Sequence, residues 1–101
     1  MKDNQALIVV DVQKDFLETG ALPVKDGSQV VPVINRISPK FKHVVFTQDW
    51  HPQGHISFAS SHSGEAPYST IDIPYGKQVL WPEHCVQNTT GAEFADGLNT
   101  E

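Results

Sequence analysis

The chain has 101 residues, of which 39% are hydrophobic and 19% are charged, and its formal net charge at pH 7 is -5. This length allows one domain, and the composition is that of a folded globular protein and not of a disordered one. No lysine- or arginine-rich run indicates a surface for nucleic acid or membranes. No apolar run reaches the length of a membrane span, about 20 residues, and the N-terminus is a poor secretory signal. With a single cysteine and no internal disulfide, we expect a cytoplasmic protein.

The first predicted element is a β-strand over residues 6–10, ALIVV, a continuous apolar run. Such a run is typical of a strand that is buried on both faces of a parallel sheet. Asp11 follows at the carboxyl end of the strand, where ligands bind in open α/β sheets. Two interpretations of Asp11 stay open, a general base or a cap for the following turn. Asp15 is interpreted as a solvated turn residue.

The next predicted element is a helix that begins near Gln29, with Ser28 as its N-cap, and ends at Pro39. Apolar residues at steps of four, three and four form its buried face: Val30, Ile34, Ile37 and Phe41. A second strand is predicted over residues 41–47, with residues 44–46 buried.

Strand, helix and strand form a β-α-β unit, so the two strands lie side by side. Asp49 follows the second strand as Asp11 follows the first, and we therefore expect both carboxylates at the same edge of the sheet. Two strands and one helix leave faces of the sheet uncovered. The fold class is thus predicted to be α/β, with residues 1–101 as the first part of a larger, doubly wound domain.

A cluster of metal-binding residue types follows the second strand. Asp49, His51 and His55 lie within seven residues, and His84 lies 33 residues after His51. Two histidines and one carboxylate can bind Zn, Fe or Mn and leave coordination positions open for water or substrate. The sequence therefore predicts a catalytic metal, although a turn-capping Asp49 and ordinary surface histidines remain the alternative.

The rest of the chain gives weaker patterns. No regular structure is predicted for residues 59–76, which are rich in Ser, Gly and Pro. Trp81 is a candidate for an aromatic ligand pocket or for a core or lid position. Cys85 is interpreted as a small buried thiol, because adjacent side chains point apart and His84 cannot serve as its base. A short helix is predicted around Ala92–Ala95.

Four blocks, ALIVVDVQKDF with GALPV, TQDWHP, HISFAS and WPEHCVQNTTGAEF, occur in this order between Ala6 and Phe94. They closely resemble the bacterial nicotinamidases (pyrazinamidases) of the isochorismatase-like cysteine hydrolases. The resemblance implies a doubly wound, mostly parallel sheet flanked by helices. It also implies hydrolysis of nicotinamide to nicotinate and ammonia, with pyrazinamide as a second substrate.

The resemblance assigns roles to seven residues. It implies that Asp11 is the catalytic aspartate, which takes a thiol proton and later helps to protonate ammonia. It implies that one divalent transition metal binds the pyridine nitrogen, with these ligands: Asp49, His51 and His84. His55 matches a histidine that binds the metal only in some members. Phe16 and Trp81 match the aromatic residues that sandwich the pyridine ring.

Two family residues are absent from this sequence. The family's catalytic lysine and its nucleophilic cysteine would both fall past Glu101, and Cys85 matches a non-catalytic cysteine. We therefore expect the N-terminal half of a nicotinamidase that is inactive alone and is completed by a C-terminal half as a separate chain. A non-catalytic metal-binding module is the alternative. The identity of the metal, and the choice between a monomer and a homo-oligomer, stay open.

Overall fold

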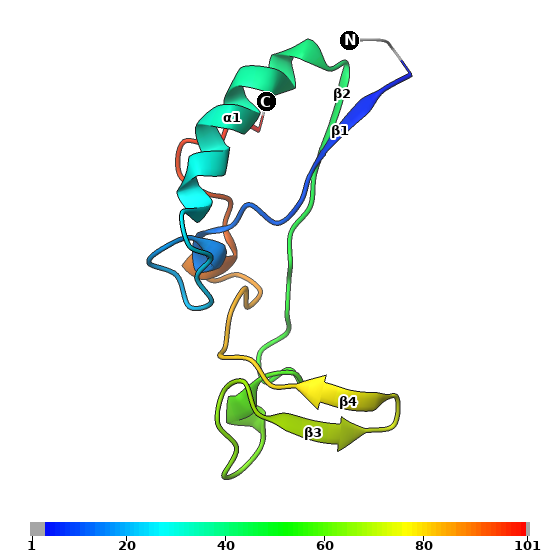
Figure 1. The fold of residues 1–101 in the computed structure, drawn as a ribbon, viewed down its shortest axis with the longest axis vertical. Coiled ribbons are helices and arrows are strands. Elements are labelled where there is room, and N and C mark those ends of the chain that lie inside the picture. Colours follow the sequence, from blue (N-terminus) through cyan, green and yellow to red (C-terminus); the bar gives the residue numbers. More distant parts are fainter. Residues whose placement is uncertain (1–3, 101) are drawn as a thin grey trace.

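The structure is a computed structural model that describes residues 4–100 (Figure 1). Within them lie one α-helix, four short strands and several 3-10 turns. The bounds of the helix and strands are β1 (Ala6–Val9), α1 (Val30–Ile37), β2 (His43–Phe46), β3 (Thr70–Ile73) and β4 (Gly76–Val79).

The predicted β-α-β unit is confirmed. β1 pairs with β2 in parallel, with Leu7 opposite Val44 and Ile8 opposite Val45, and α1 connects them and runs alongside (Figure 1). The helix is a little shorter than the prediction and ends before a 3-10 turn over Ser38–Lys40. The prediction of Ser28 as N-cap is wrong, since its hydroxyl donates to the Glu18 carboxylate instead.

One face of the β1–β2 sheet packs against α1 and the tail of the chain. The core consists of Val9, Val12, Ile34 and Ala95, and other half-buried apolar side chains pack against it: Leu7, Leu17, Val31, Val44, Phe46 and Leu98. Of the predicted helix face, Ile34 is buried but Val30 is exposed.

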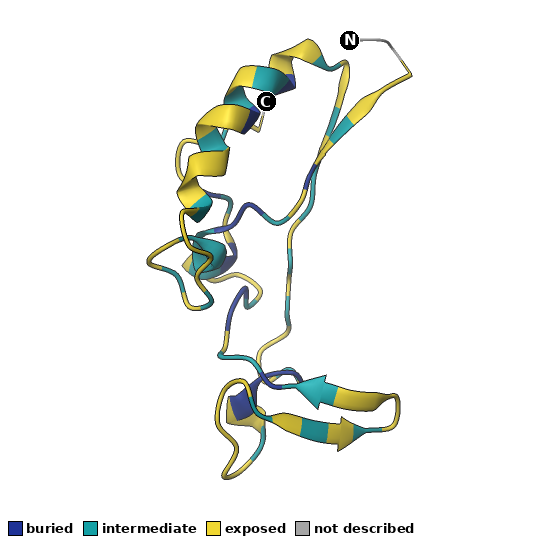
Figure 2. Ribbon diagram, viewed as in Figure 1, coloured by how far each residue is buried: buried dark blue, intermediate teal, exposed yellow. Residues whose placement is uncertain are grey.

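The opposite face of the sheet is bare, which confirms the expectation that two strands and one helix leave a face uncovered; within residues 4–100 the strands are not buried on both faces. Ile8 is 62% exposed, Val10 is 65% exposed and Val45 is 51% exposed (Figure 2). Strand side chains alternate between the two faces. The helix covers the face of Leu7 and Val9, and nothing within residues 4–100 covers the face of Ile8 and Val45.

The prediction of no regular structure over residues 59–76 is also wrong. β3 and β4 form an antiparallel hairpin whose turn residues are Pro74 and Tyr75 (Figure 1). Along β3, Ile71 and Ile73 are half-buried and alternate with exposed residues, which is the pattern of a strand with one packed face.

The tail forms a 3-10 turn over Thr90–Ala92 where a helix was predicted around Ala92–Ala95. It then runs antiparallel to the loop after β1. The amide of Lys14 donates to the carbonyl of Glu93 at 3.0 Å, and the amide of Ala95 donates to the carbonyl of Val12 at 2.9 Å. This pairing fixes the loop that begins with Asp11.

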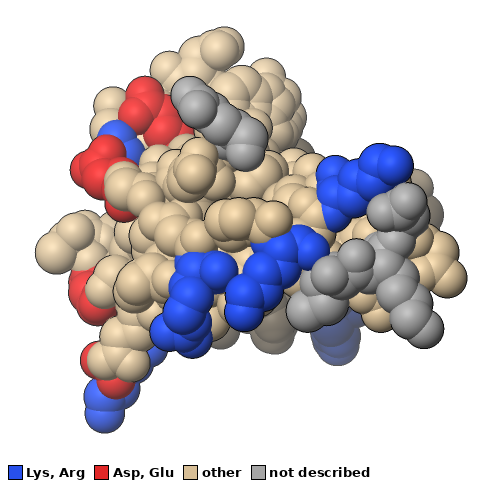
Figure 3. Space-filling view, turned by 90° about the horizontal axis from the view of Figure 1, so that it is seen from above, with Lys and Arg blue, Asp and Glu red and all other residues tan. Residues whose placement is uncertain are grey.

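The described chain is elongated. Its radius of gyration is 16.1 Å and its principal extents are 50 × 29 × 24 Å. A compact domain of 100 residues has a radius of gyration of about 13 Å. The β3–β4 hairpin lies at one end and α1 with the β1–β2 sheet at the other (Figure 1). On the face viewed in Figure 3, basic side chains lie in several places among uncharged ones, and acidic side chains gather on one side.

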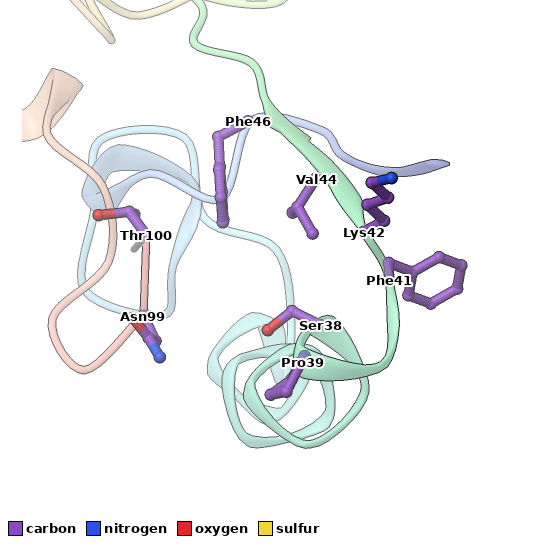
Figure 4. Close-up of a pocket in the computed structure, with 8 residues that line it drawn as sticks. All are labelled: Ser38, Pro39, Phe41, Lys42, Val44, Phe46, Asn99 and Thr100. Carbon is purple, nitrogen blue, oxygen red and sulfur yellow. The ribbon is translucent and has the colours of Figure 1, made fainter. Parts of the chain in front are cut away.

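A cavity of about 410 Å³ opens between the end of α1, β2 and the tail (Figure 4). Val44 and Phe46 from β2 and Asn99 and Thr100 from the tail line it, and the ring of Phe41 points away from the tail. None of the predicted site residues lines this cavity. Among residues 4–100, no helix has the length and apolarity needed to cross a membrane.

Candidate metal centre

Three of the four predicted metal-binding side chains converge. Asp49, His51 and His84 each offer one ligand atom, and these atoms all lie within 4.8 Å of one another. The Nε2 atoms of His51 and His84 each lie 3.4 Å from an Asp49 carboxylate oxygen, one on Oδ1 and the other on Oδ2. His84 is buried and the other two are half-buried, so the interpretation as ordinary surface residues is wrong for His84.

Backbone carbonyls orient both imidazoles. Nδ1 of His51 lies 3.2 Å from the carbonyl oxygen of His84, and Nδ1 of His84 lies 2.8 Å from that of Pro82. A carbonyl oxygen can only accept, so Nδ1 is the donor in both contacts. Nε2 of each ring is thus the atom that faces Asp49 and is left for a metal ion, which is the arrangement of histidine ligands in metal sites.

His55 has the opposite arrangement. Its Nδ1 accepts from the backbone amide of Ser57 at 3.1 Å and lies 2.7 Å from the Ser57 hydroxyl. A backbone amide can only donate, so the proton of neutral His55 is on Nε2, where it blocks metal coordination. The His55 ring packs against His51, with centroids 5.1 Å apart, but His55 does not belong to the converging group.

Backbone pairing brings the two distant histidine segments together. The amide of His51 donates to the carbonyl of Cys85 at 2.8 Å, and the amide of Gln87 donates to the carbonyl of His51 at 2.8 Å. His51 and Val86 thus form a parallel bridge outside the named strands. Because the bridge is backbone to backbone, the main chain itself places His84 beside His51.

Gln13 is a supporting residue that the sequence analysis missed. Its side chain is fully buried and forms two hydrogen bonds with the backbone of Asp49. Oε1 accepts from the Asp49 amide at 2.8 Å, and Nε2 donates to the Asp49 carbonyl at 2.8 Å. Nε2 also donates to the carbonyl of Ala92 at 2.7 Å. The available signal was the alternation of polar residues directly after β1, at Asp11, Gln13 and Asp15.

Asp11 lies at the same sheet edge as Asp49, as predicted. Its backbone is in the left-handed region with φ 56°, and its carboxylate accepts from the Thr47 hydroxyl at 2.7 Å. The carboxylate therefore bonds across the sheet instead of capping the next turn. Asp11 also lines a largely apolar cavity of about 320 Å³ together with Val12, Phe16 and Val24.

The two predicted aromatic residues lie in different surroundings. The ring of Phe16 contacts that of His84, with centroids 5.5 Å apart at 60°, so one side chain borders both the cavity and the ligand cluster. Trp81 is half-buried, and its ring packs perpendicular to that of Tyr68 at 6.0 Å.

Cys85 is a buried free thiol, as predicted. Burial, reinforced by the nearby carboxylates of Asp49, Asp15 and Asp11, raises the pKa of the Cys85 thiol to about 12. The thiolate is the nucleophilic form of cysteine. Cys85 therefore stays neutral at physiological pH and is a poor nucleophile.

Asp15 is not a solvated turn residue, and that prediction is wrong. It is half-buried, and its carboxylate accepts from the backbone amide of Cys85 at 2.8 Å. The same carboxylate lies 3.4 Å from the amide of Ala21. Asp15 thus connects the loop after β1 to the segment that contains His84.

Together, a parallel β-α-β unit and two histidines with a carboxylate beside its strand ends define an α/β protein with a candidate transition-metal centre. The chain belongs to the isochorismatase family, since the isochorismatase domain matches residues 5–101. This agrees with the α/β fold class that the sequence predicted.

The most similar relatives found include nicotinamidases. The nicotinamidase of Acinetobacter baylyi is 54% identical over 97 residues, which cover 96% of this chain and 45% of that protein. The solved structure of an Acinetobacter baumanii nicotinamidase/pyrazinamidase superposes with a TM-score of 0.92 at 52% identity, over 97% of this chain and 47% of that one.

A third relative contains a metal. The pyrazinamidase of Pyrococcus horikoshii, solved in complex with zinc, is 42% identical, with a TM-score of 0.65 over 94% of this chain and 46% of that one. The chain spans about half the length of the relatives it matches.

Proposed function

We propose that this chain supplies the metal-binding half of a nicotinamidase active site, which hydrolyses nicotinamide to nicotinate and ammonia and also accepts pyrazinamide. The observation that carries the proposal is the convergence of Asp49, His51 and His84 within 4.8 Å, beside a cavity lined by Asp11 and Phe16. The identities of the relatives support the choice of substrate.

The three side chains fit a divalent transition metal. Two imidazoles and one carboxylate form a borderline ligand set that suits Zn, Fe or Mn, and both Nε2 atoms face Asp49. The zinc complex of a relative favours zinc among these metals. When bound, the metal would use its open coordination positions to anchor the pyridine nitrogen of the substrate.

Asp11 is the proposed general base of the reaction. Amide hydrolysis by a thiol needs one group to take the thiol proton and to return it to the leaving ammonia. The Thr47 hydroxyl donates to Oδ1 of Asp11, which orients the carboxylate and leaves Oδ2 available. Phe16 forms an apolar wall of the same cavity, suited to one face of an aromatic ring. Trp81 is the proposed second aromatic contact.

We propose that the nucleophile comes from outside residues 1–101, because their only cysteine is buried and neutral. We propose the remaining part of the domain, as a separate or continuous polypeptide, as its source and as the partner of this chain. The relatives are about twice as long, and the bare sheet face at Ile8, Val10 and Val45 offers that partner an apolar surface.

A second candidate function is a non-catalytic metal-binding module. The neutral, buried Cys85 favours it, since residues 1–101 then contain a metal site without a nucleophile. Native mass spectrometry separates the two. Co-migration with a second polypeptide of similar mass and one metal ion supports the enzyme, whereas this chain with metal alone supports the module.

The activity test measures ammonia release from nicotinamide by the protein as it occurs, with any remaining part of its domain present. Asp11→Ala should lower kcat by about 100- to 10,000-fold, the usual contribution of a general base, and should leave the metal bound. Asp72→Ala removes a carboxylate that pairs with Lys77 on the exposed hairpin and serves as the control. Near-normal turnover by Asp11→Ala would show that Asp11 is not the base.

A further inference from the structure

The residue that follows the ligand His84 has an unfavourable backbone conformation. Cys85 has φ 49°, in the left-handed region, although it is not a glycine. An L-residue with a side chain pays a conformational cost there, and such residues persist only where the surroundings hold them. The carbonyl of the His84–Cys85 peptide lies 3.2 Å from Nδ1 of His51, so this peptide belongs to one proposed ligand and contacts another.

One side chain holds the amide of this peptide. Oδ2 of Asp15 accepts from the Cys85 amide at 2.8 Å, across 70 positions of sequence. A carboxylate is a stronger acceptor for a backbone amide than a neutral group, and partial burial of the pair adds to its strength. Without it, the Cys85 amide loses its partner and the backbone is free to return to negative φ.

Gly91 leaves the room that the Asp15 carboxylate occupies. A Cβ built on Gly91 would overlap the carboxylate group of Asp15, so only glycine leaves room for it there. Gly91 has no positive φ, and its lack of a side chain therefore serves this close approach and not a turn. The carboxylate is thus positioned by packing on one side and by the Cys85 amide on the other.

From these contacts we infer that Asp15 is a positioning residue for the metal centre, which holds the strained His84–Cys85 peptide so that His84 points at Asp49. The inference rests on the proposed metal site. Asp15 is not itself a ligand and acts on His84 through the backbone amide of Cys85. Loss of the Asp15 carboxylate should let His84 move away in the metal-free protein, and metal binding must then rebuild the strained turn.

The test measures zinc affinity by competition with a chromophoric chelator, and ligand geometry from the visible spectrum of bound cobalt. Asp15→Ala should weaken zinc binding by about 10- to 100-fold, as substitutions of residues that orient metal ligands do. It should also alter the visible absorption bands of bound cobalt. Gly91→Ala should give the same result, because its new Cβ displaces the carboxylate. Asp15→Asn, which keeps the shape, should show a smaller loss of the same kind.

Two further variants make the test specific. In the Asp15→Ala background, Cys85→Gly should recover most of the lost affinity, because glycine adopts the left-handed conformation without cost. Glu18→Gln is the matched control. Glu18 also accepts a backbone amide, from Ser28 at 3.0 Å, but lies on the exposed loop and should leave affinity and spectrum unchanged. Melting curves of the metal-free variants show that each is folded.

The outcomes separate this inference from the proposed function. Wild-type zinc affinity and cobalt spectrum in Asp15→Ala, with metal lost in His84→Ala, would overturn the role of Asp15 and leave the metal site intact. Unchanged zinc affinity in both His51→Ala and His84→Ala would overturn the metal site itself. Weakened binding in both Asp15→Ala and Gly91→Ala, with recovery through Cys85→Gly, supports the inference.

Discussion

Replacement of Gln13 by Met tests how the backbone of Asp49 is fixed. Methionine preserves most of the volume of glutamine but removes its donor and acceptor. The amide and carbonyl of Asp49 lose hydrogen bonds of 2.8 Å each in a partly buried setting. Ala92 keeps a second donor, Gln48, at 3.1 Å. At about 1–2 kcal/mol for each unpaired backbone group, the free energy of unfolding should fall by about 2–4 kcal/mol.

Urea unfolding of the metal-free protein measures this loss, and zinc competition measures its effect on the site. Gln48→Met is the matched control, since it removes one hydrogen bond from an exposed side chain to the carbonyl of Ala92 and should cost about 0.5 kcal/mol or less. Zinc affinity should fall in the Gln13 variant alone. The reasoning is refuted if both variants unfold at the same urea concentration.

Three other predictions concern the site. His51→Ala and His84→Ala should abolish stoichiometric zinc binding, measured by elemental analysis. His55→Ala should keep the zinc, because Nδ1 of His55 accepts from the amide of Ser57. Zinc retained in His51→Ala or His84→Ala would exclude the replaced histidine as a ligand. Folding raises the pKa of the Cys85 thiol from 9.0 to about 12. The contribution of the neutral thiol to the free energy of unfolding is therefore complete below about pH 9 and is lost as the pH rises toward 12. Urea unfolding at pH 8 and 10 should show a larger decline for the wild type than for Cys85→Ala, and equal declines would contradict this. Thr47→Val should lower kcat for nicotinamide about tenfold without loss of zinc, because the Asp11 carboxylate loses its donor; unchanged kcat would show that this bond does not orient the base.

Local patterns were enough to predict the frame of the site. Continuous apolar runs and a helical stripe predict the β-α-β unit, and the parallel pairing of its strands places Asp11 and Asp49 at one edge. The hairpin was missed although the alternation at Ile71 and Ile73 was present, because the Ser-, Gly- and Pro-rich residues before it indicated a loop.

The alternation after β1 points to Gln13 and Asp15 but does not reveal their roles, because these roles depend on tertiary contacts. Gln13 acts through the backbone of Asp49, 36 positions away, and Asp15 acts through the amide of Cys85, 70 positions away. A glutamine or aspartate after a strand has many more common uses, such as turns and caps. The tautomers of the histidines likewise depend on which backbone groups happen to face Nδ1.

The bare face at Ile8 and Val45 has a practical consequence for work with the isolated chain. Two exposed apolar residues stand directly opposite each other on a sheet that has two strands within residues 4–100, so that each of them is an edge strand there. Sheets of this kind add strands from any available source. Purified alone, the chain should precipitate as its concentration rises and should do so sooner in sulfate, so co-expression is the safer route to material for crystallisation.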